Sequence, residues 1–214
     1  MTRVKICGLS RLQDIITVNR YMPDYIGFVF AGGSKRQIDD ETAKTLKRAL
    51  NPFIKAVGVF VNEEIGHIVH LCETDTIDVV QLHGDESEKD ILALQKLITK
   101  PVIKAVRVRD EKDILKAENL SCDYLLLDAY QEKEYGGSGK TFDWSVLRSM
   151  EGIRKPFYLA GGINLENVMC AVSRFHPYCV DVSSGVETDG VKDPQKIREL
   201  ITKVRDANVN HYEN

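Results

Sequence analysis

The stretch KAVGVFVNEEIGHIVHLCETDTIDVVQLHG, residues 55–84, places two short apolar runs on either side of a more polar segment. The runs KAVGVFV (55–61) and VVQLHG (79–84) are rich in valine, which predicts buried β-strands. The segment between them is predicted to contain a helix. A strand, a crossover helix and a second strand form the unit from which parallel sheets are built.

The same alternation extends along the whole chain. Six further strands are predicted at VKICG (4–8), YIGFVF (25–30), VIKAVRV (102–108), YLLLDA (124–129), FYLAGG (157–162) and VDVSSG (180–185). Polar stretches with helical spacing lie between them. The segment DESEKDILALQKLI (85–98) has Ile91, Leu94, Leu97 and Ile98 on one face, and DPQKIRELITKV (193–204) begins with Asp193 as N-cap and Pro194 in the first turn.

Eight strand–helix units predict closure into one (β/α)₈ barrel domain, residues 1–214, near the lower length limit of that fold. An open, doubly wound sheet is the alternative arrangement of the same elements. Its dinucleotide-binding members carry G-x-G-x-x-G in the first turn, and the corresponding turn CGLSR lacks it. The barrel is therefore the preferred prediction.

The composition excludes several classes of protein. The formal net charge is −3, and Lys and Arg are dispersed among Asp and Glu, so a nucleic-acid partner is not expected. No apolar run approaches the roughly 18 residues that span a bilayer, and the N-terminus lacks a secretory signal, so we expect a cytoplasmic protein without membrane contact. Five cysteines without a C-x-x-C pair predict reduced thiols rather than disulfides or structural zinc.

Two long connections follow strands and are expected on the carboxyl-terminal rim, where active sites of such barrels lie. They are AGGSKRQIDD (31–40) and YQEKEYGGSGKTFD (130–143), and the GGSG tract in the second offers hinge-like backbone freedom. The tripeptide GKT (139–141) resembles the end of a P-loop, but Glu134 stands where the first glycine is required. We therefore expect no nucleotide site there.

Strand alternation places a polar set of side chains inside the barrel. The same-face pairs are Lys5 with Cys7, Gln81 with His83, Leu126 with Asp128, and Asp181 with Ser183. Each has a plainer interpretation: Cys7 as core packing, Asp128 as an N-cap, and His83 as a hydrogen-bond partner of a loop. Their positions at strand ends favour a role in a site. His67 and His70, near Glu63 and Glu64, fall on an outer helix, where a metal site is not expected.

Two glycine turns end neighbouring strands of the predicted ring. They are LAGGIN (159–164) and DVSSGVE (181–187), and the second carries two serine hydroxyls. Glycine turns expose several backbone N–H groups, which can hold a phosphate dianion. The pair therefore predicts a phosphorylated small-molecule ligand, although the glycines could also serve only to make tight turns.

Taken together, these motifs resemble the phosphoribosylanthranilate isomerase family of tryptophan biosynthesis. The motifs in order are KICG (5–8), GFVF (27–30) with Ser34 and Arg36, VGVFVN (57–62), QLHGDE (81–86), LLLD (125–128), GGSGKTFDW (136–144), LAGGINLENV (159–168) and DVSSGVE (181–187). The family commonly has proline between the serine and the arginine of the second motif, where this chain has Lys35.

The resemblance implies an Amadori rearrangement of N-(5-phosphoribosyl)anthranilate to the 1-deoxyribulose 5-phosphate ketose, without metal or organic cofactor. It implies that Asp128 is the general acid and Cys7 the general base. Arg36 would bind the anthranilate carboxylate, with His83 and Asp181 as further substrate contacts. By the same resemblance the phosphate would bind at Gly161, Gly162, Ser183, Ser184 and Gly185.

These roles set requirements on the protein. A free thiol titrates near 8.5 and an aspartate near 3.9, so Cys7 needs a positive neighbour such as Lys5, and Asp128 needs desolvation.

Three alternative functions agree less well with these residues. The related isomerase of histidine biosynthesis has a carboxylate at the strand-one position, where this chain has Cys7. An inactive phosphate-binding barrel would be expected to lose Cys7 or Asp128, and a thiol redox protein would need a resolving cysteine. The oligomeric state is expected to be a monomer or a homodimer.

Overall fold

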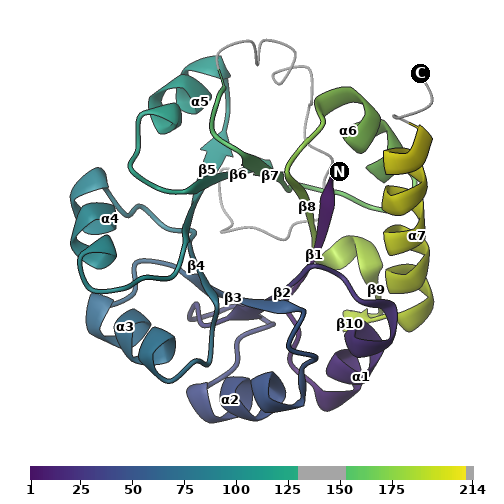
Figure 1. Ribbon diagram of the computed structural model, residues 1–214, viewed down its shortest axis with the longest axis horizontal. Helices are drawn as coiled ribbons and strands as arrows, with labels where there is room; N and C mark the ends of the chain where they lie inside the picture. The colour runs from purple at the N-terminus through teal and green to yellow at the C-terminus, as the bar shows by residue number, and fades with distance from the viewer. Residues whose placement is uncertain (130–152, 211–214) are drawn as a thin grey trace.

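The computed structural model describes residues 1–129 and 153–210, in which eight strands form a closed barrel (Figure 1). Neighbouring strands pair in parallel in chain order, and the last pairs with the first. The strands are β1 (Arg3–Cys7), β2 (Tyr25–Val29), β3 (Lys55–Phe60), β4 (Val79–Leu82), β5 (Val102–Val108), β6 (Tyr124–Ala129), β7 (Phe157–Leu159) and β8 (Cys179–Val182). The predicted fold class is confirmed.

Helices cover the outside of the strand ring (Figure 1). They are α1 (Leu12–Tyr21), α2 (Asp40–Ala49), α3 (Ile65–Glu73), α4 (Glu88–Gln95), α5 (Glu111–Glu118), α6 (Val168–Phe175) and α7 (Pro194–Asn210). Helix α7 begins as predicted, because Asp193 Oδ1 accepts the backbone N–H of Gln195 over 2.8 Å. Helix α4 begins later than the predicted 85–98, since Ser87 and Asp90 form a capping box at its start, and it ends earlier, at Gln95.

The apolar runs form strands because both of their faces are buried. Outward residues such as Val4, Ile6, Val80 and Leu82 join the layer between the barrel and the helices. The inner layer consists of Val57, Val79, Ile103, Ala105, Leu126, Tyr158, Ala160 and Cys179. This separation follows the predicted alternation. At the carboxyl-terminal end of several strands, the next inward-facing position is occupied by a polar residue.

A small hairpin follows β8 that was not predicted. After the turn at Ser184–Val186, strands β9 (Glu187–Thr188) and β10 (Val191–Lys192) pair antiparallel. The two residues between them, Asp189 and Gly190, both have positive φ. An Asp-Gly pair is a strong signal for such a two-residue hairpin turn, so the sequence did contain the information.

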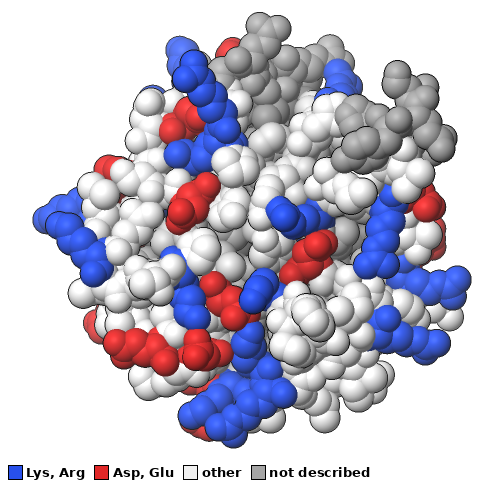
Figure 2. All heavy atoms as spheres, viewed as in Figure 1, with Lys and Arg blue, Asp and Glu red and all other residues white. Residues whose placement is uncertain are grey.

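The described residues include no helix that combines the length and apolarity needed to cross a bilayer. On the face shown in Figure 2, Lys and Arg side chains alternate with Asp and Glu, and neither sign of charge covers that face. The long connection 130–143, with its GGSG tract, lies outside the described residues.

Candidate active site

A chain of hydrogen-bonded polar side chains crosses the interior of the barrel at the carboxyl-terminal ends of four strands. Asp181 Oδ2 in β8 accepts from Lys5 Nζ in β1 at 2.9 Å, and Lys5 Nζ donates to Gln81 Oε1 in β4 at 2.7 Å. Gln81 Nε2 lies 2.8 Å from His83 Nδ1, and His83 Nε2 lies 3.1 Å from Asp128 Oδ2 in β6. Five members of the inward set predicted from strand alternation therefore form one connected network.

The buried charge of Lys5 is balanced within this network. The side chain has no exposed surface, and an unpaired ammonium there would be costly. Burial lowers its pKa, but the combined effects of the Asp181 carboxylate and of Cys7 and Cys179 outweigh burial, and the pKa is raised overall. Asp181 has one oxygen on Lys5, while its buried Oδ1 has no hydrogen-bond partner among the described residues. A buried acceptor of this kind suits a ligand hydroxyl.

Cys7 ends β1 beside this network and is partly exposed. Its sulfur packs against β2, since a Cβ built on Gly27 would lie only 2.7 Å from Cys7 Sγ. Burial raises the pKa of the Cys7 thiol, and the positive charges of Lys5 and Lys192 act in the opposite direction. The predicted positive neighbour Lys5 is therefore present, but burial outweighs it.

Arg36 reaches the same rim from the connection after β2. Its stem lies over the end of β1, since a Cβ on Gly8 would be 2.3 Å from Arg36 Cδ. Its guanidinium bonds Glu187 in β9 through Nε at 2.8 Å and Nη2 at 2.7 Å. Glu187 also accepts from the buried Lys192 Nζ at 2.5 Å. Glu187 and Lys192 are site neighbours that the sequence analysis missed, although the Asp-Gly turn between them could have drawn attention to the pair.

Lys192 connects the ion-pair cluster of Arg36, Glu187 and Lys192 to the β8 turn. Its Nζ donates to the Ser183 backbone oxygen at 2.9 Å, and Ser183 Oγ donates to the Cys7 carbonyl at 3.1 Å. Burial lowers the pKa of Lys192, against the opposing effect of the Glu187 carboxylate. The second glycine turn is thus connected to the end of β1.

The two glycine turns lie against each other. A Cβ on Gly185 would be 2.0 Å from the Ile163 carbonyl oxygen, so the β8 turn touches the β7 turn with no room for a side chain. Gly161 and Gly162 both have positive φ, at 81° and 75°. Ser183 and Ser184 flank the contact and are half-buried. The arrangement brings together the residues for which phosphate binding was predicted.

The outer histidine cluster makes structural contacts. His67 Nε2 lies 2.9 Å from Asp40 Oδ1, and its ring packs edge-on against Phe30 and Phe60. Glu63 lies 3.4 Å from His67 Nδ1. The described part of the chain contains no group of three or more His, Cys, Asp or Glu placed to hold a metal.

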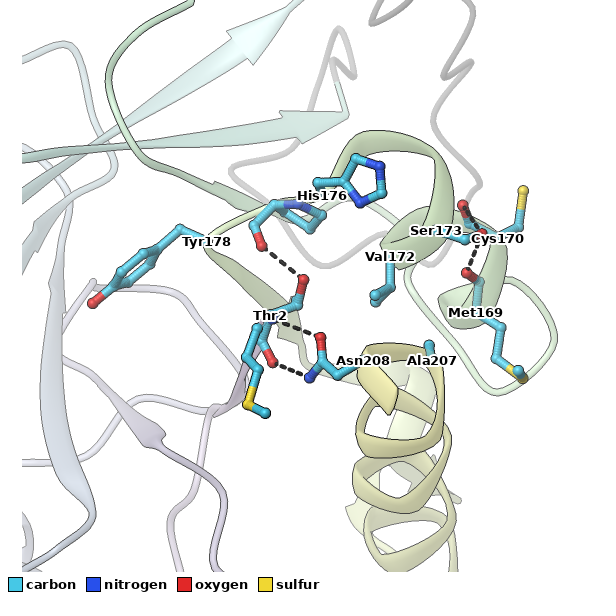
Figure 3. A pocket seen from close by; sticks show the side chains of 11 residues that line it. Thr2, Met169, Cys170, Val172, Ser173, His176, Tyr178, Ala207 and Asn208 are labelled. Atoms are coloured by element: carbon cyan, nitrogen blue, oxygen red, sulfur yellow. Dashed lines mark hydrogen bonds between the residues drawn. The ribbon is translucent and has the colours of Figure 1, made fainter. Parts of the chain in front are cut away.

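A cavity of about 600 Å³ lies away from the rim, beside residues that precede β1 and β8 and between α6 and α7 (Figure 3). Thr2 and Asn208 line it and bond each other twice, over 2.7 and 2.9 Å. None of the predicted site residues lines this cavity. The predicted catalytic and binding residues instead gather at the opposite ends of the strands.

Comparison with known proteins agrees with this geometry. Residues 4–203 match the family model described as N-(5′-phosphoribosyl)anthranilate (PRA) isomerase. The chain belongs to this family. An N-(5′-phosphoribosyl)anthranilate isomerase of Endomicrobium trichonymphae is 52% identical over 205 residues, covering 96% of this chain and 99% of the relative. The protein of that name from Lachnoclostridium phytofermentans is 48% identical, covering 93% and 95%.

Solved structures of the PRA isomerase family share the fold. The crystal structure of phosphoribosylanthranilate isomerase from Thermotoga maritima superposes with a TM-score of 0.87 at 39% identity, covering 96% of this chain and all of that one. Another structure of the family, at 37% identity and a TM-score of 0.84, is a complex with reduced 1-(o-carboxyphenylamino)-1-deoxyribulose 5-phosphate, and it covers 96% of this chain and all of its own. The family predicted from the sequence motifs is confirmed.

Proposed function

We propose that this chain catalyses the Amadori rearrangement of N-(5′-phosphoribosyl)anthranilate to 1-(2-carboxyphenylamino)-1-deoxyribulose 5-phosphate in tryptophan biosynthesis. Membership of the PRA isomerase family supports the reaction. The observation that supports the assignment of roles is the polar network, which connects Asp128 to Lys5, two residues from Cys7 on the same strand. This connection supports the proposal that an acid and a base act at one barrel mouth.

In this proposal Asp128 is the general acid. Its proton passes to the furanose ring oxygen as the bond from that oxygen to the first sugar carbon breaks, which leaves a carboxylate and an open iminium form of the substrate. Cys7, as thiolate, then removes the proton from the second sugar carbon. The electron pair of that C–H bond forms the enolamine, which tautomerises to the ketone.

The remaining predicted residues bind the substrate in this proposal. Arg36 holds the anthranilate carboxylate with charge-assisted hydrogen bonds. Asp181 Oδ1, which has no hydrogen-bond partner among the described residues, accepts a sugar hydroxyl, and His83 contacts the substrate beside Asp128. The contact between the two glycine turns supports a phosphate site at Gly161, Gly162, Ser183, Ser184 and Gly185.

The broader setting follows from the same proposal. The substrate is a phosphorylated small molecule, and neither nucleic acid nor a membrane is involved. We propose a cytoplasmic enzyme consisting of one barrel domain, either a monomer or a homodimer. A related Thermotoga maritima phosphoribosylanthranilate isomerase is described as dimeric, which supports testing the second state by ultracentrifugation.

The test is a fluorescence assay that follows consumption of freshly made phosphoribosylanthranilate by the purified protein. Cys7→Ser and Asp128→Asn are each expected to reduce kcat at least about a hundredfold with unchanged folding. Cys72→Ser is the matched control, because Cys72 is buried in α3 outside the barrel and is expected to leave the rate unchanged. A near-normal rate in either site variant would remove that residue from the mechanism, and an inactive wild-type protein would contradict the proposed function.

A further inference from the structure

Gln81 lies at the centre of the polar network, between a cation and a histidine. Its side chain is almost completely buried, at 1% exposure, and Lys5 is fully buried. Gln81 Oε1 lies 2.7 Å from Lys5 Nζ, and Gln81 Nε2 lies 2.8 Å from His83 Nδ1. His83 Nε2 in turn lies 3.1 Å from Asp128 Oδ2.

The direction of every hydrogen bond in this row follows from its first member. A lysine ammonium can only donate, so the Gln81 atom that faces it must be the amide oxygen. Turning the amide over would place its NH₂ group against the ammonium and leave two buried donors facing each other. The amide NH₂ therefore faces His83 and donates to Nδ1.

The same logic continues through the imidazole ring. A ring nitrogen that accepts a hydrogen bond carries no proton, so Nδ1 is bare and the proton of the neutral ring is on Nε2. Nε2–H then donates to Oδ2 of Asp128. Lysine, glutamine, histidine and aspartate thus form a row in which every bond has one donor and one acceptor, running from β1 through β4 to β6.

We propose that Gln81 is a positioning residue that holds His83 as the neutral Nε2–H tautomer, and that His83 thereby keeps Oδ2 of Asp128 occupied as an acceptor. The other oxygen, Oδ1, is then the atom of Asp128 that carries and delivers the catalytic proton. The catalytic consequence rests on the proposed isomerase function, whereas the tautomer of His83 does not.

The arrangement has a physical advantage for an acid that must change charge during the reaction. Once Asp128 has delivered its proton, the Nε2–H group already points at the carboxylate and requires no rearrangement. A histidine with its proton on Nδ1 would instead present a bare Nε2 to Oδ2. Two acceptors would then face each other when Asp128 is ionised.

The tautomer can be measured without any activity. ¹⁵N-labelled histidine in the whole protein reports each ring nitrogen as protonated or bare, and His83→Gln identifies the His83 signals. In the wild-type protein at neutral pH we expect Nδ1 of His83 to be bare and Nε2 to be protonated. A proton on Nδ1, alone or together with one on Nε2, would overturn the proposal.

Two variants test the role of Gln81. Gln81→Leu removes the donor to Nδ1, and Gln81→Glu keeps an acceptor for Lys5 but offers Nδ1 a second acceptor, which favours a proton there. Both are expected to change the His83 nitrogen pattern and to lower kcat at least about tenfold, with KM changed by less than about threefold. Because Gln81→Glu retains the contact with Lys5, it still tests the proposal if Gln81→Leu does not fold.

Gln95 provides the matched control. It is a glutamine of α4 whose Nε2 donates to the Ser121 carbonyl at 2.8 Å, away from the barrel interior. Gln95→Leu and Gln95→Glu are expected to leave the His83 spectrum, kcat and KM unchanged. A wild-type His83 pattern and a wild-type kcat in folded Gln81→Leu would overturn the proposal. If the wild-type protein shows no isomerase activity, the nitrogen spectra still decide whether Gln81 sets the tautomer.

Discussion

Arg36 and Glu187 form a two-point ion pair, in which Nε and Nη2 of the guanidinium donate over 2.8 and 2.7 Å. Arg36 follows β2, whereas Glu187 begins the hairpin after β8. The pair uses one edge of the planar guanidinium and leaves the Nη1 end for another acceptor. Glu187 therefore sets the direction in which Arg36 presents its remaining N–H groups.

Glu187→Gln is expected to weaken substrate capture. The amide keeps the size of the side chain but loses the charge-assisted bonds, so Arg36 is held less firmly. We expect KM to rise about tenfold with kcat within about twofold, measured by steady-state kinetics. Arg36→Ala should raise KM further, and Glu166→Gln, on an exposed glutamate, should change neither constant. A loss of kcat at constant KM would show that Glu187 does not act through Arg36.

The reactivity of Cys7 should depend on pH and on Lys192. Burial raises the pKa of this thiol, and Lys5 and Lys192 oppose the rise. Alkylation requires the thiolate, so its rate should increase as the pH rises through that pKa. Lys192→Met removes one opposing charge, so at a given pH the rate should fall severalfold.

This alkylation is best measured by mass spectrometry of the Cys7 peptide. A Cys170→Ser background removes the exposed thiol from competition. Equal alkylation rates with Lys192 and Met at position 192 would mean that the Lys192 charge does not influence the thiol.

Gly185→Ala should disrupt the proposed phosphate site. The new methyl group would lie 2.0 Å from the Ile163 carbonyl oxygen, so the two turns must separate. We expect inorganic phosphate to bind at least about tenfold more weakly by calorimetry. Gly66→Ala, in α3 with open space around its Cβ, should retain wild-type phosphate binding. Wild-type affinity in Gly185→Ala would place the phosphate elsewhere.

Glu187 should also contribute to stability in a pH-dependent way. Burial raises its pKa, but the hydrogen bonds and the positive charges of Arg36 and Lys192 together outweigh burial, so the pKa lies below its ordinary value of 4.5. A lowered folded-state pKa contributes stability above the unfolded value, and this contribution is lost as the pH falls through the folded value. The melting temperature of Glu187→Gln should therefore be lower than wild type at pH 7, with the difference shrinking in acid. A difference independent of pH would assign the effect to packing.

Local patterns were sufficient to predict the strands and several site positions. Runs of Val, Ile and Leu marked each barrel strand to within a few residues, because a strand that is buried on both faces consists mainly of apolar residues. The period of two placed Lys5, Gln81, Asp128 and Asp181 on the inner side, and the structure confirms their inward network. The Asp193 cap could be predicted from the sequence because the backbone N–H groups that it accepts lie two and three residues further along the chain.

The sequence by itself determined which side chains face the barrel interior, because successive side chains of a strand alternate between its two faces. Only the tertiary structure decided which of them bond one another. Lys5 meets Gln81 across 76 positions of the chain, and Arg36 meets Glu187 across 151. Such pairs exist only once the ring has closed, since closure sets the strand register, and no local pattern specifies which distant donor will face which acceptor.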